Sequence, residues 1–285
     1  MNILTDEKQY LDCLNYVLEN GQSKGDRTGT GTISTFRPPT MRFKLNDGET
    51  FPLLTTKKVR YKTILKELLW FLSGSTNIND LDSKIWDEWA ADDGSIGPMY
   101  GELFRDLYIS IGGVKDPIGD LINDIKDDPN SRRLVMTTWR PDDLPLSHLS
   151  PQENVRIGNM ALAPCHGTVI QFYVNTGKLS MSTYQRSADM MLGLPFNIAS
   201  YATLLLMVAS LTGLYADELI YDLGDAHIYK DHIDGAKEQL NRGIRDTLPS
   251  LEIDKNIDDI GNFTLDSVKL VNYTHQQEIK LKVSV

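Results

Sequence analysis

Residues Pro195 to Leu211 read PFNIASYATLLLMVASL, and this stretch decides the fold. It predicts a helix that is apolar on nearly every face, and a helix of this kind is buried on all sides. We therefore expect it at the centre of the molecule. Its longest apolar run, Leu204 to Ala209, is too short to span a bilayer. With 285 residues, 41% of them hydrophobic, the chain can build a large core around it.

Three further stretches predict helices around this centre. The first runs from Thr5 to Glu19 and begins with acidic residues, which suit the positive end of a helix. The second, from Tyr61 to Leu72, carries a continuous apolar stripe. The third, from Asp231 to Leu240, is amphipathic and is expected at the surface.

Strands alternate with the helices along the whole chain, and neither a linker nor an internal repeat divides it. The sequence therefore predicts a single α+β domain over residues 1–285, with a large twisted mixed β-sheet flanked by helices. A polar segment from Pro141 to Asn159 lacks periodicity and is expected to be a surface loop. The expected strands are Arg133–Trp139, Thr168–Val174, Leu179–Tyr184, Leu219–Leu223, Ser267–Tyr273 and Glu278–Val285.

Composition narrows the class of protein. A formal net charge of -10 argues against a nucleic-acid-binding surface, which needs clustered positive charge. Two cysteines, Cys13 and Cys165, provide no disulfide framework and indicate a reducing compartment. The N-terminus does not resemble a signal peptide. We expect a soluble cytoplasmic protein that does not need a membrane.

Cys165 is the first candidate for chemistry. It lies in Ala163-Pro164-Cys165-His166-Gly167, directly before an expected strand, where proline and glycine suggest a fixed and exposed turn. Free cysteines are more often small buried hydrophobic residues, so a structural role is the better interpretation of this motif taken alone.

Several arginines shift the interpretation of Cys165 from a structural role towards a catalytic one. Arg27 lies in a Gly/Thr-rich turn from Asp26 to Thr32 that suits a phosphate, although such runs are more often ordinary hairpins. Arg186 ends a strand that we expect beside the Cys165 strand, and a guanidinium near a thiol lowers the thiol pKa. Arg132 and Arg133 form a further basic site, with a solvated charge pair as the alternative.

Glu67 lies at the edge of the apolar stripe on the second helix. Most carboxylates in such a position reach solvent, whereas a minority lie in a cleft with a raised pKa and act as general acid or base. The five histidines have no metal-site spacing: His227 and His232 are five apart and no cysteine is near. We expect no metal.

The order of motifs along the chain resembles that of the thymidylate synthases, from the first helix to the C-terminal valine. Each motif is weak evidence alone, but together and in this order they are specific. They are Asp26–Gly31, Glu67–Leu72, Ile85–Trp89, Gly97–Gly101, Ser131–Arg133, Ala163–His166, Tyr184–Ser187, Gly193–Tyr201 and Gly224–Tyr229.

The resemblance implies the reductive methylation of dUMP to dTMP. The carbon and the hydride come from 5,10-methylenetetrahydrofolate, a co-substrate that leaves as dihydrofolate. Cys165 is implied as the nucleophile that adds to C6 of the uracil ring and makes C5 an enolate. Glu67, Tyr100 and His166 are implied in ordering water and moving protons, with Asp189 as a further catalytic residue.

The resemblance also implies how the ligands bind. Arg27 and Arg186 hold the phosphate together with Arg132 and Arg133 of the partner subunit, which makes the protein an obligate homodimer. Asn197 reads the pyrimidine edge, because its amide accepts from N3–H and donates to O4. The other dUMP-binding residues implied are Gln185, Ser187, His227 and Tyr229. The folate-binding residues implied are Trp86, Trp89, Asp189, Gly193 and Val285.

The chain departs from the family pattern in a few places. Arg140 stands where an asparagine is usual, and the loop from Arg140 to Met160 is longer than usual. There is also one extra residue between Cys165 and Gln171, which a β-bulge at Gly167-Thr168 would absorb. Ala226 replaces a usual threonine, and Phe104 a usual tryptophan.

Two other functions stay open on the sequence. A dUMP hydroxymethylase uses the same folate but lets water attack in place of hydride, and it needs the same Asn197. Trp86 and the complete C-terminal tail favour a site closed to water, and hence the synthase. A nucleotide-sensing or RNA-binding module on the same fold is disfavoured by the intact Cys165, Glu67 and Tyr100 and by the negative charge.

Overall fold

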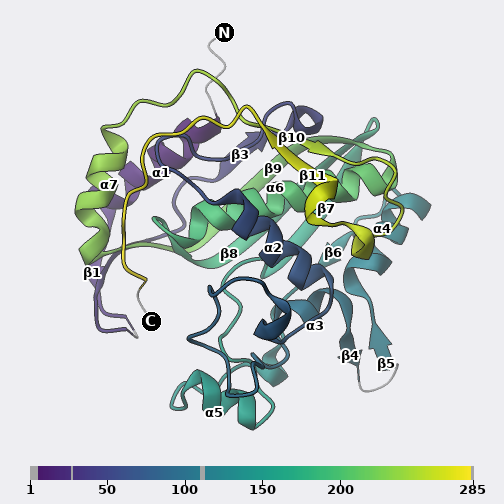
Figure 1. The fold of residues 1–285 in the computed structure, drawn as a ribbon, viewed down its shortest axis with the longest axis horizontal. Coiled ribbons are helices and arrows are strands. Elements are labelled where there is room, and N and C mark those ends of the chain that lie inside the picture. The colour runs from purple at the N-terminus through teal and green to yellow at the C-terminus, as the bar shows by residue number, and fades with distance from the viewer. Residues whose placement is uncertain (1–5, 27, 110–112, 284–285) are drawn as a thin grey trace.

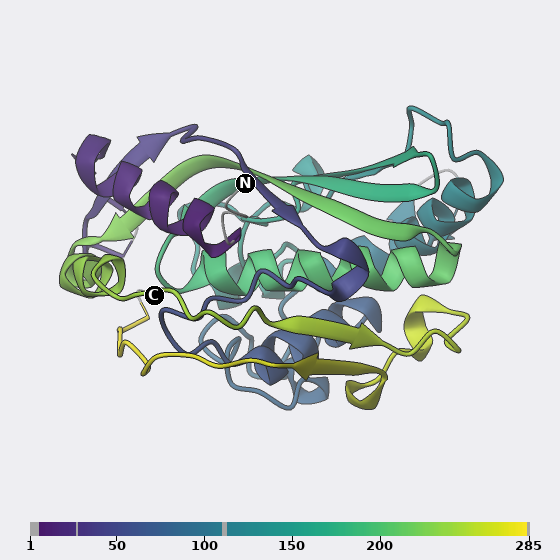
Figure 2. The same ribbon diagram turned by 90° about the horizontal axis from the view of Figure 1, so that it is seen from above.

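The structure is a computed structural model that describes residues 6–26, 28–109 and 113–283. The expected central helix is α6 (Gly193–Thr212), and Figure 2 shows it running through the middle of the molecule. Apart from Phe196, every residue from Leu194 to Ala209 is buried. By length and hydropathy α6 could cross a membrane, but 89% of its apolar window is buried inside the protein, as in a core helix.

A seven-stranded sheet covers one side of α6 (Figure 2). Its order is β1-β2-β9-β8-β7-β6, with β3 also paired to β9. The β8–β9 pair is parallel and the other pairs are antiparallel, so the sheet is mixed and the expected α+β class is confirmed. The strands are β1 (Gln22–Lys24), β2 (Thr32–Phe36), β3 (Met41–Lys44), β6 (Val135–Met136), β7 (Val169–Asn175), β8 (Lys178–Asp189) and β9 (Tyr215–Tyr229).

A second layer lies on the other side of α6, as Figure 2 shows. It contains α2 (Tyr61–Leu72), α3 (Tyr100–Arg105) and the hairpin of β10 (Ser250–Ile253) and β11 (Val268–Val271). The remaining elements are α1 (Asp6–Asn20), α4 (Pro117–Asp127), α5 (Pro151–Arg156), α7 (Ile233–Leu240), the hairpin of β4 (Leu107–Ile109) and β5 (Gly113–Lys115), and six 3-10 turns (Asn46–Gly48, Ile78–Asp80, Pro141–Asp143, Lys230–His232, Ile260–Asn262 and Leu265–Ser267).

The four helices expected from periodicity are confirmed as α1, α2, α6 and α7, although Thr5 lies outside the described residues. Helices α3, α4 and α5 were not expected. Two of them are short, with six residues each. Helix α4 has a strong start signal, since Asp116 accepts a hydrogen bond from Gly119 N and Pro117 follows at the first helical position.

The expected strands differ from the structure in extent, and one differs in kind. The strands expected at Leu179–Tyr184 and Leu219–Leu223 are longer in the structure, as β8 and β9, and the strand expected at Ser267–Tyr273 is shorter, as β11. The expected strand Arg133–Trp139 shrinks to Val135–Met136, because β7 pairs with only these two residues. The described part of Glu278–Val285, residues 278–283, is not a strand. It is held by side chains instead: Arg60 pairs with Glu278 at 3.2 Å, and His232 Nε2 donates to Lys282 O at 2.7 Å.

One face of the sheet is left open. Along β7 the residues alternate, with Ile170 and Phe172 buried and Val169, Gln171 and Tyr173 exposed. The exposed Val135 lies beside them on β6. Large apolar side chains gathered on one open sheet face are typical of a surface that another protein covers.

Candidate active site

The turn that carries Cys165 is fixed from two directions. The backbone N–H of Cys165 donates to the Tyr100 hydroxyl at 3.0 Å, and that hydroxyl lies 3.8 Å from Sγ. On the other side, Arg186 donates from Nε to Pro164 O and from Nη2 to Ala163 O, both at 2.8 Å. The two neighbours Tyr100 and Arg186 therefore hold the nucleophile candidate in place before β7 begins.

The thiol pKa differs from the sequence expectation. Burial of the group raises the pKa of Cys165 above its ordinary value, while the hydrogen bond with Tyr100 and the charge of Arg186 offset part of that rise. Arg186 thus acts in the expected direction, but burial outweighs it.

Arg186 has an aromatic partner that the sequence did not indicate. Its guanidinium carbon lies 5.4 Å from the centre of the Trp139 ring, within the range of a cation–π contact. Trp139 follows β6, so this contact ties the end of β8 to the segment that begins with Arg132 and Arg133.

Tyr100, His166 and Tyr201 form a buried aromatic group next to Cys165. The rings of Tyr100 and His166 stack with centroids 4.3 Å apart, and His166 Nδ1 shares a hydrogen bond of 2.8 Å with the Tyr201 hydroxyl. Burial lowers the pKa of His166 to about 3, so the ring is neutral at physiological pH. Tyr201 was not expected in the site, although it lies one helical turn after Asn197 on α6 and so on the same face.

The extra residue after Cys165 is accommodated by Gly167. This glycine has a φ of +59°, in the left-handed region, and a methyl group there would overlap the Tyr201 hydroxyl. The β7–β8 ladder then starts at Val169 opposite Tyr184 without a shift in register. Thr168 N also donates to Tyr184 O at 3.0 Å, so Thr168 and Val169 both face Tyr184, and this two-against-one pairing agrees with the β-bulge expected at Gly167-Thr168.

Glu67 is buried and has a raised pKa, which was the less common of the two cases expected for it. It is only 9% exposed, and Trp86 Nε1 donates a hydrogen bond of 2.7 Å to its carboxylate. Burial raises the pKa of Glu67 to about 7, and the Trp86 bond offsets part of the rise. The Trp86 ring also packs edge-on against Tyr100, with centroids 6.1 Å apart, which joins this acid to the Cys165 group.

Asn197 lies at the end of a hydrogen-bond chain. Tyr221 donates from its hydroxyl to Gln185 Oε1 at 2.7 Å, and Gln185 Nε2 donates to Asn197 Oδ1 at 3.1 Å and to Ser187 O at 3.0 Å. Gln185 is 1% exposed and Asn197 8%. This hydrogen-bond chain orients the Asn197 amide with its oxygen towards Gln185. Both the oxygen and the nitrogen of the Gln185 amide take part in it.

Asp189, His227 and Gly193 lie around Asn197. Asp189 is opposite His227 in the parallel β8–β9 register, and its Oδ1 accepts from the backbone just before α6. Gly193 begins α6, and a methyl group there would lie 3.7 Å from Asn197 Oδ1 and 3.8 Å from Asp189 Cβ. His227 is anchored by Asp225 at 3.3 Å and packs edge-on against Tyr229, with ring centroids 5.3 Å apart.

Some expected site residues are not brought to this group. Arg27 and Val285 lie outside the described residues. Arg132 and Arg133 are exposed, one residue before the start of β6, and neither forms an ion pair within the described part of the chain. Trp89 packs against Trp86 with centroids 5.5 Å apart, whereas Ser187 is half-buried on β8.

Lys57 is a buried cation that the sequence did not single out. Its ammonium donates to Met191 O, between Asp189 and the start of α6. Burial lowers the pKa of Lys57 to about 8, while the nearby Asp189 acts in the opposite direction. The available signal was its place in the polar run Thr55–Lys58, shortly before the helix that carries Glu67.

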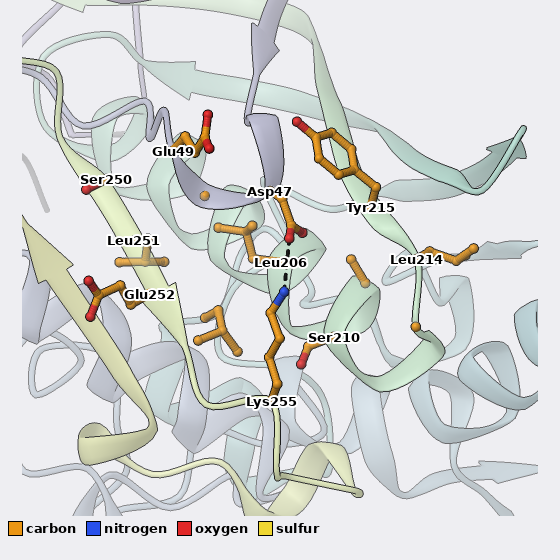
Figure 3. Close-up of a pocket in the computed structure, with 14 residues that line it drawn as sticks. Asp47, Glu49, Leu206, Ser210, Leu214, Tyr215, Ser250, Leu251, Glu252 and Lys255 are labelled. Atoms are coloured by element: carbon orange, nitrogen blue, oxygen red, sulfur yellow. Dashed lines mark hydrogen bonds and ion pairs between the residues drawn. The ribbon is translucent and has the colours of Figure 1, made fainter.

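A cavity of about 600 Å³ lies elsewhere, at the far end of α6 (Figure 3). Leu206 and Ser210 of α6 line it, and an ion pair of 3.1 Å joins Asp47 to Lys255 at its side. No candidate catalytic residue lines this cavity. Among the described residues, no group of three or more His, Cys, Asp or Glu is placed to hold a metal ion; the expectation of no metal remains a prediction.

Comparison with known proteins gives one consistent result. A family model described as "Thymidylate synthase" matches residues 8–285. A curated protein named "Thymidylate synthase", from Francisella philomiragia subsp. philomiragia, is 47% identical over 281 residues. The match covers 98% of this chain and 100% of that relative.

Proposed function

This chain belongs to the thymidylate synthase family, and from that premise we propose which of its residues perform the reaction. The enzyme is a methyltransferase that converts dUMP to dTMP, with methylenetetrahydrofolate as co-substrate. The alternative function, a dUMP hydroxymethylase, has no support from the comparisons. The observation that carries the site assignment is the grouping of Cys165, Tyr100, His166 and Glu67 around shared contacts.

Cys165 is the nucleophile in this proposal. Its sulfur forms a bond to C6 of the uracil ring, and the C5–C6 double-bond electrons move to make C5 an enolate that attacks the folate methylene. The proton on the resting thiol must leave before this step. Tyr100 lies 3.8 Å from Sγ, and Arg186 lowers the thiol pKa, so both favour the thiolate once substrate has entered.

Glu67 is the general acid and base. A carboxylate with a pKa of about 7 both takes and gives up protons at the pH of the cell. Its protonated form can donate to a ring nitrogen of the folate or to an ordered water, and its ionised form can accept the proton from C5. His166, which is neutral and stacked on Tyr100, helps to order this water.

Asn197 selects uracil over cytosine. Its amide oxygen accepts from N3–H and its NH₂ donates to O4, a pattern that cytosine does not match. We assign Gln185 to the orientation of this amide, because Gln185 is buried behind Asn197 and bonded at both ends by the protein. Ser187, His227 and Tyr229 complete the nucleotide site, with the last two at the deoxyribose hydroxyl.

Four arginines hold the phosphate, and the site is shared within an obligate homodimer. Arg27 and Arg186 come from one subunit, and Arg132 and Arg133 come from its partner. Support comes from the open sheet face with Val135 and Tyr173, which are 44% and 64% exposed. Arg132 and Arg133 lie close to this face, because only one residue separates Arg133 from Val135 on β6. A dimer that buries this face carries the two exposed arginines to its partner.

The folate lies against Trp86 and Trp89, with Asp189, Gly193 and the C-terminal Val285 completing its pocket. Loss of the C5 proton breaks the bond between the methylene and the folate nitrogen. Hydride then passes from the tetrahydrofolate to the exocyclic methylene, the Cys165–C6 bond breaks, and dTMP and dihydrofolate are released. We place the enzyme in the cytoplasm without need of nucleic acid or membrane, supported by two free cysteines, Cys13 and Cys165.

A mechanism-based probe tests the assignment. 5-Fluoro-dUMP has no proton at C5 to release, so the reaction stops with protein, nucleotide and folate covalently joined. We expect intact-mass and peptide spectra to place this adduct on Cys165, and we expect no adduct in Cys165→Ala. An adduct on another residue contradicts the proposal, and so does hydroxymethyl-dUMP as the main product from dUMP.

A further inference from the structure

The polar segment 141–159 is a folded unit and not an irregular loop. Ser150 and Glu153 form a reciprocal capping box at the start of α5. Asn154, only 1% exposed, accepts from Leu146 N at 2.7 Å and donates to the carbonyl oxygens of Leu146 and Ser150 at 3.2 and 3.0 Å. These bonds close the segment on itself and give α5 a fixed position.

Segment 141–159 packs against residues 86–97, the stretch that carries Trp86 and Trp89. Gln152 Nε2 donates to the carbonyl oxygen of Glu88 at 2.9 Å, and Arg156 lies 3.4 Å from Asp92. At its end, the Asn159 carbonyl lies so close to Gly97 that a methyl group there would overlap it. Figure 1 shows α5 at the lower end of the molecule, beside the segment between α2 and α3.

The contacted tryptophan turn, residues 86–89, has little backbone hydrogen bonding of its own, although the Trp86 side chain is held by Glu67 and Tyr100. It is made of turns, with one internal bond of 3.1 Å from Trp89 N to Trp86 O. Within the described residues, the hydrogen bond to the Glu88 carbonyl comes from Gln152. In the sequence, Glu88 lies between Trp86, which donates to Glu67, and Trp89. A shift of Glu88 therefore moves the wall that the two indoles form.

We propose that Gln152 is a positioning residue for the folate, and that segment 141–159 braces the tryptophan turn through the Glu88 carbonyl. This inference rests on the proposed function, which places Trp86 and Trp89 against the folate. From its sequence the segment was expected to be a surface loop. It lies on the surface, but its contacts give it a role in co-substrate affinity.

The test is Gln152→Met, which keeps the length of the side chain and removes the donor. A net hydrogen bond of ordinary strength corresponds to a two- to tenfold change, so we expect the KM for methylenetetrahydrofolate to rise about threefold to tenfold. The KM for dUMP and kcat at saturating folate should stay within about twofold. Arg156→Ala is the matched control on the same helix. Its pair with Asp92 is exposed at both ends, 59% and 95%, and should contribute little.

A second variant separates positioning from general damage. Asn154→Ala loosens the whole segment, so it should raise the folate KM more than Gln152→Met while the KM for dUMP again stays constant. An unchanged folate KM in both variants overturns the inference. So does a parallel rise in both KM values together with a lower unfolding temperature, because that describes a global loss of structure.

Failure of the proposed function gives a different result. In that case the wild type does not turn over dUMP with methylenetetrahydrofolate at all, and the brace is judged by acrylamide quenching of tryptophan fluorescence. Greater quenching in Gln152→Met than in Arg156→Ala supports a brace on the tryptophan turn. Equal quenching in the two variants overturns it.

Discussion

The indole of Trp86 donates a hydrogen bond of 2.7 Å to the buried carboxylate of Glu67. Within the described residues Glu67 has no cationic partner, so burial is left to raise its pKa to about 7. A carboxyl group that changes charge near neutral pH is suited to proton transfer. Because burial disfavours the charged carboxylate, ionised Glu67 lowers the stability of the folded protein.

Glu67→Gln should lower kcat by about a hundredfold or more, because a positioned acid–base group contributes that much. Wild-type kcat/KM should show an inflection near pH 7, which the variant lacks. The folded pKa lies above the ordinary 4.5, so the stabilising contribution is complete below about pH 4.5 and is lost as the pH rises through 7. Above pH 8 the variant should therefore be more stable than the wild type, by up to about 3 kcal/mol in urea titrations. A pH-independent difference in stability contradicts the raised pKa.

Cys165→Ala should abolish turnover and leave dUMP binding largely intact. The nucleophile and the arginines that hold the phosphate are different groups, and loss of a covalent nucleophile costs several orders of magnitude in rate. Steady-state assays and equilibrium binding of dUMP measure the two effects. Cys13→Ala is the matched control, since Cys13 is a buried free cysteine on α1 and makes none of the contacts described for Cys165. Substantial turnover by purified Cys165→Ala would contradict the assignment of Cys165 as the nucleophile.

Asn197→Asp should move the preference from dUMP towards dCMP. A protonated carboxyl group can donate to cytosine N3 and accept from its amine, and Gln185 Nε2 still finds an oxygen to bond. Competition between the two nucleotides for the enzyme measures the shift. If the ratio of affinities does not change, Asn197 does not face the pyrimidine.

Gly167→Ala should destabilise the protein by about 1 to 3 kcal/mol and slow turnover. Alanine at a φ of +59° is strained, and its methyl group displaces the Tyr201 hydroxyl that bonds His166. Gly243→Ala is the control, because a methyl group there meets no atom within 4 Å. Thermal unfolding and kcat are measured for both variants. Equal effects of the two changes mean that the Gly167 turn is not needed.

A chain with Arg132→Ala and Arg133→Ala should regain activity when it exchanges subunits with a Cys165→Ala chain. One hybrid site then combines an intact cysteine with intact arginines from the partner. Subunit exchange is verified by native mass spectrometry, and dTMP formation is measured. If exchange occurs without activity, these arginines serve their own subunit or have another role.

Local sequence patterns predicted the long helices better than the long strands: β9 has 15 residues where five were expected. The bounds of α2, Tyr61–Leu72, agree with the expected ones, and α6 differs by two residues at its start and one at its end. Both carry uninterrupted apolar patterns, and such patterns depend only on which side of an element is buried. Cys165 and Glu67 were candidates on their sequence context, although the local pattern alone favoured a structural role for the first and a solvent-exposed position for the second.

By itself, the sequence determined the fold class, the central helix and the candidate residues for the chemistry. Only the tertiary structure decided which partners they meet: Tyr201 on His166, Gln185 behind Asn197, and Gln152 on the Glu88 carbonyl. It also decided that burial outweighs Arg186 at the Cys165 thiol. The physical reason is that periodicity records the burial of each residue, whereas hydrogen bonds and pKa shifts depend on groups distant in sequence that only folding brings within reach.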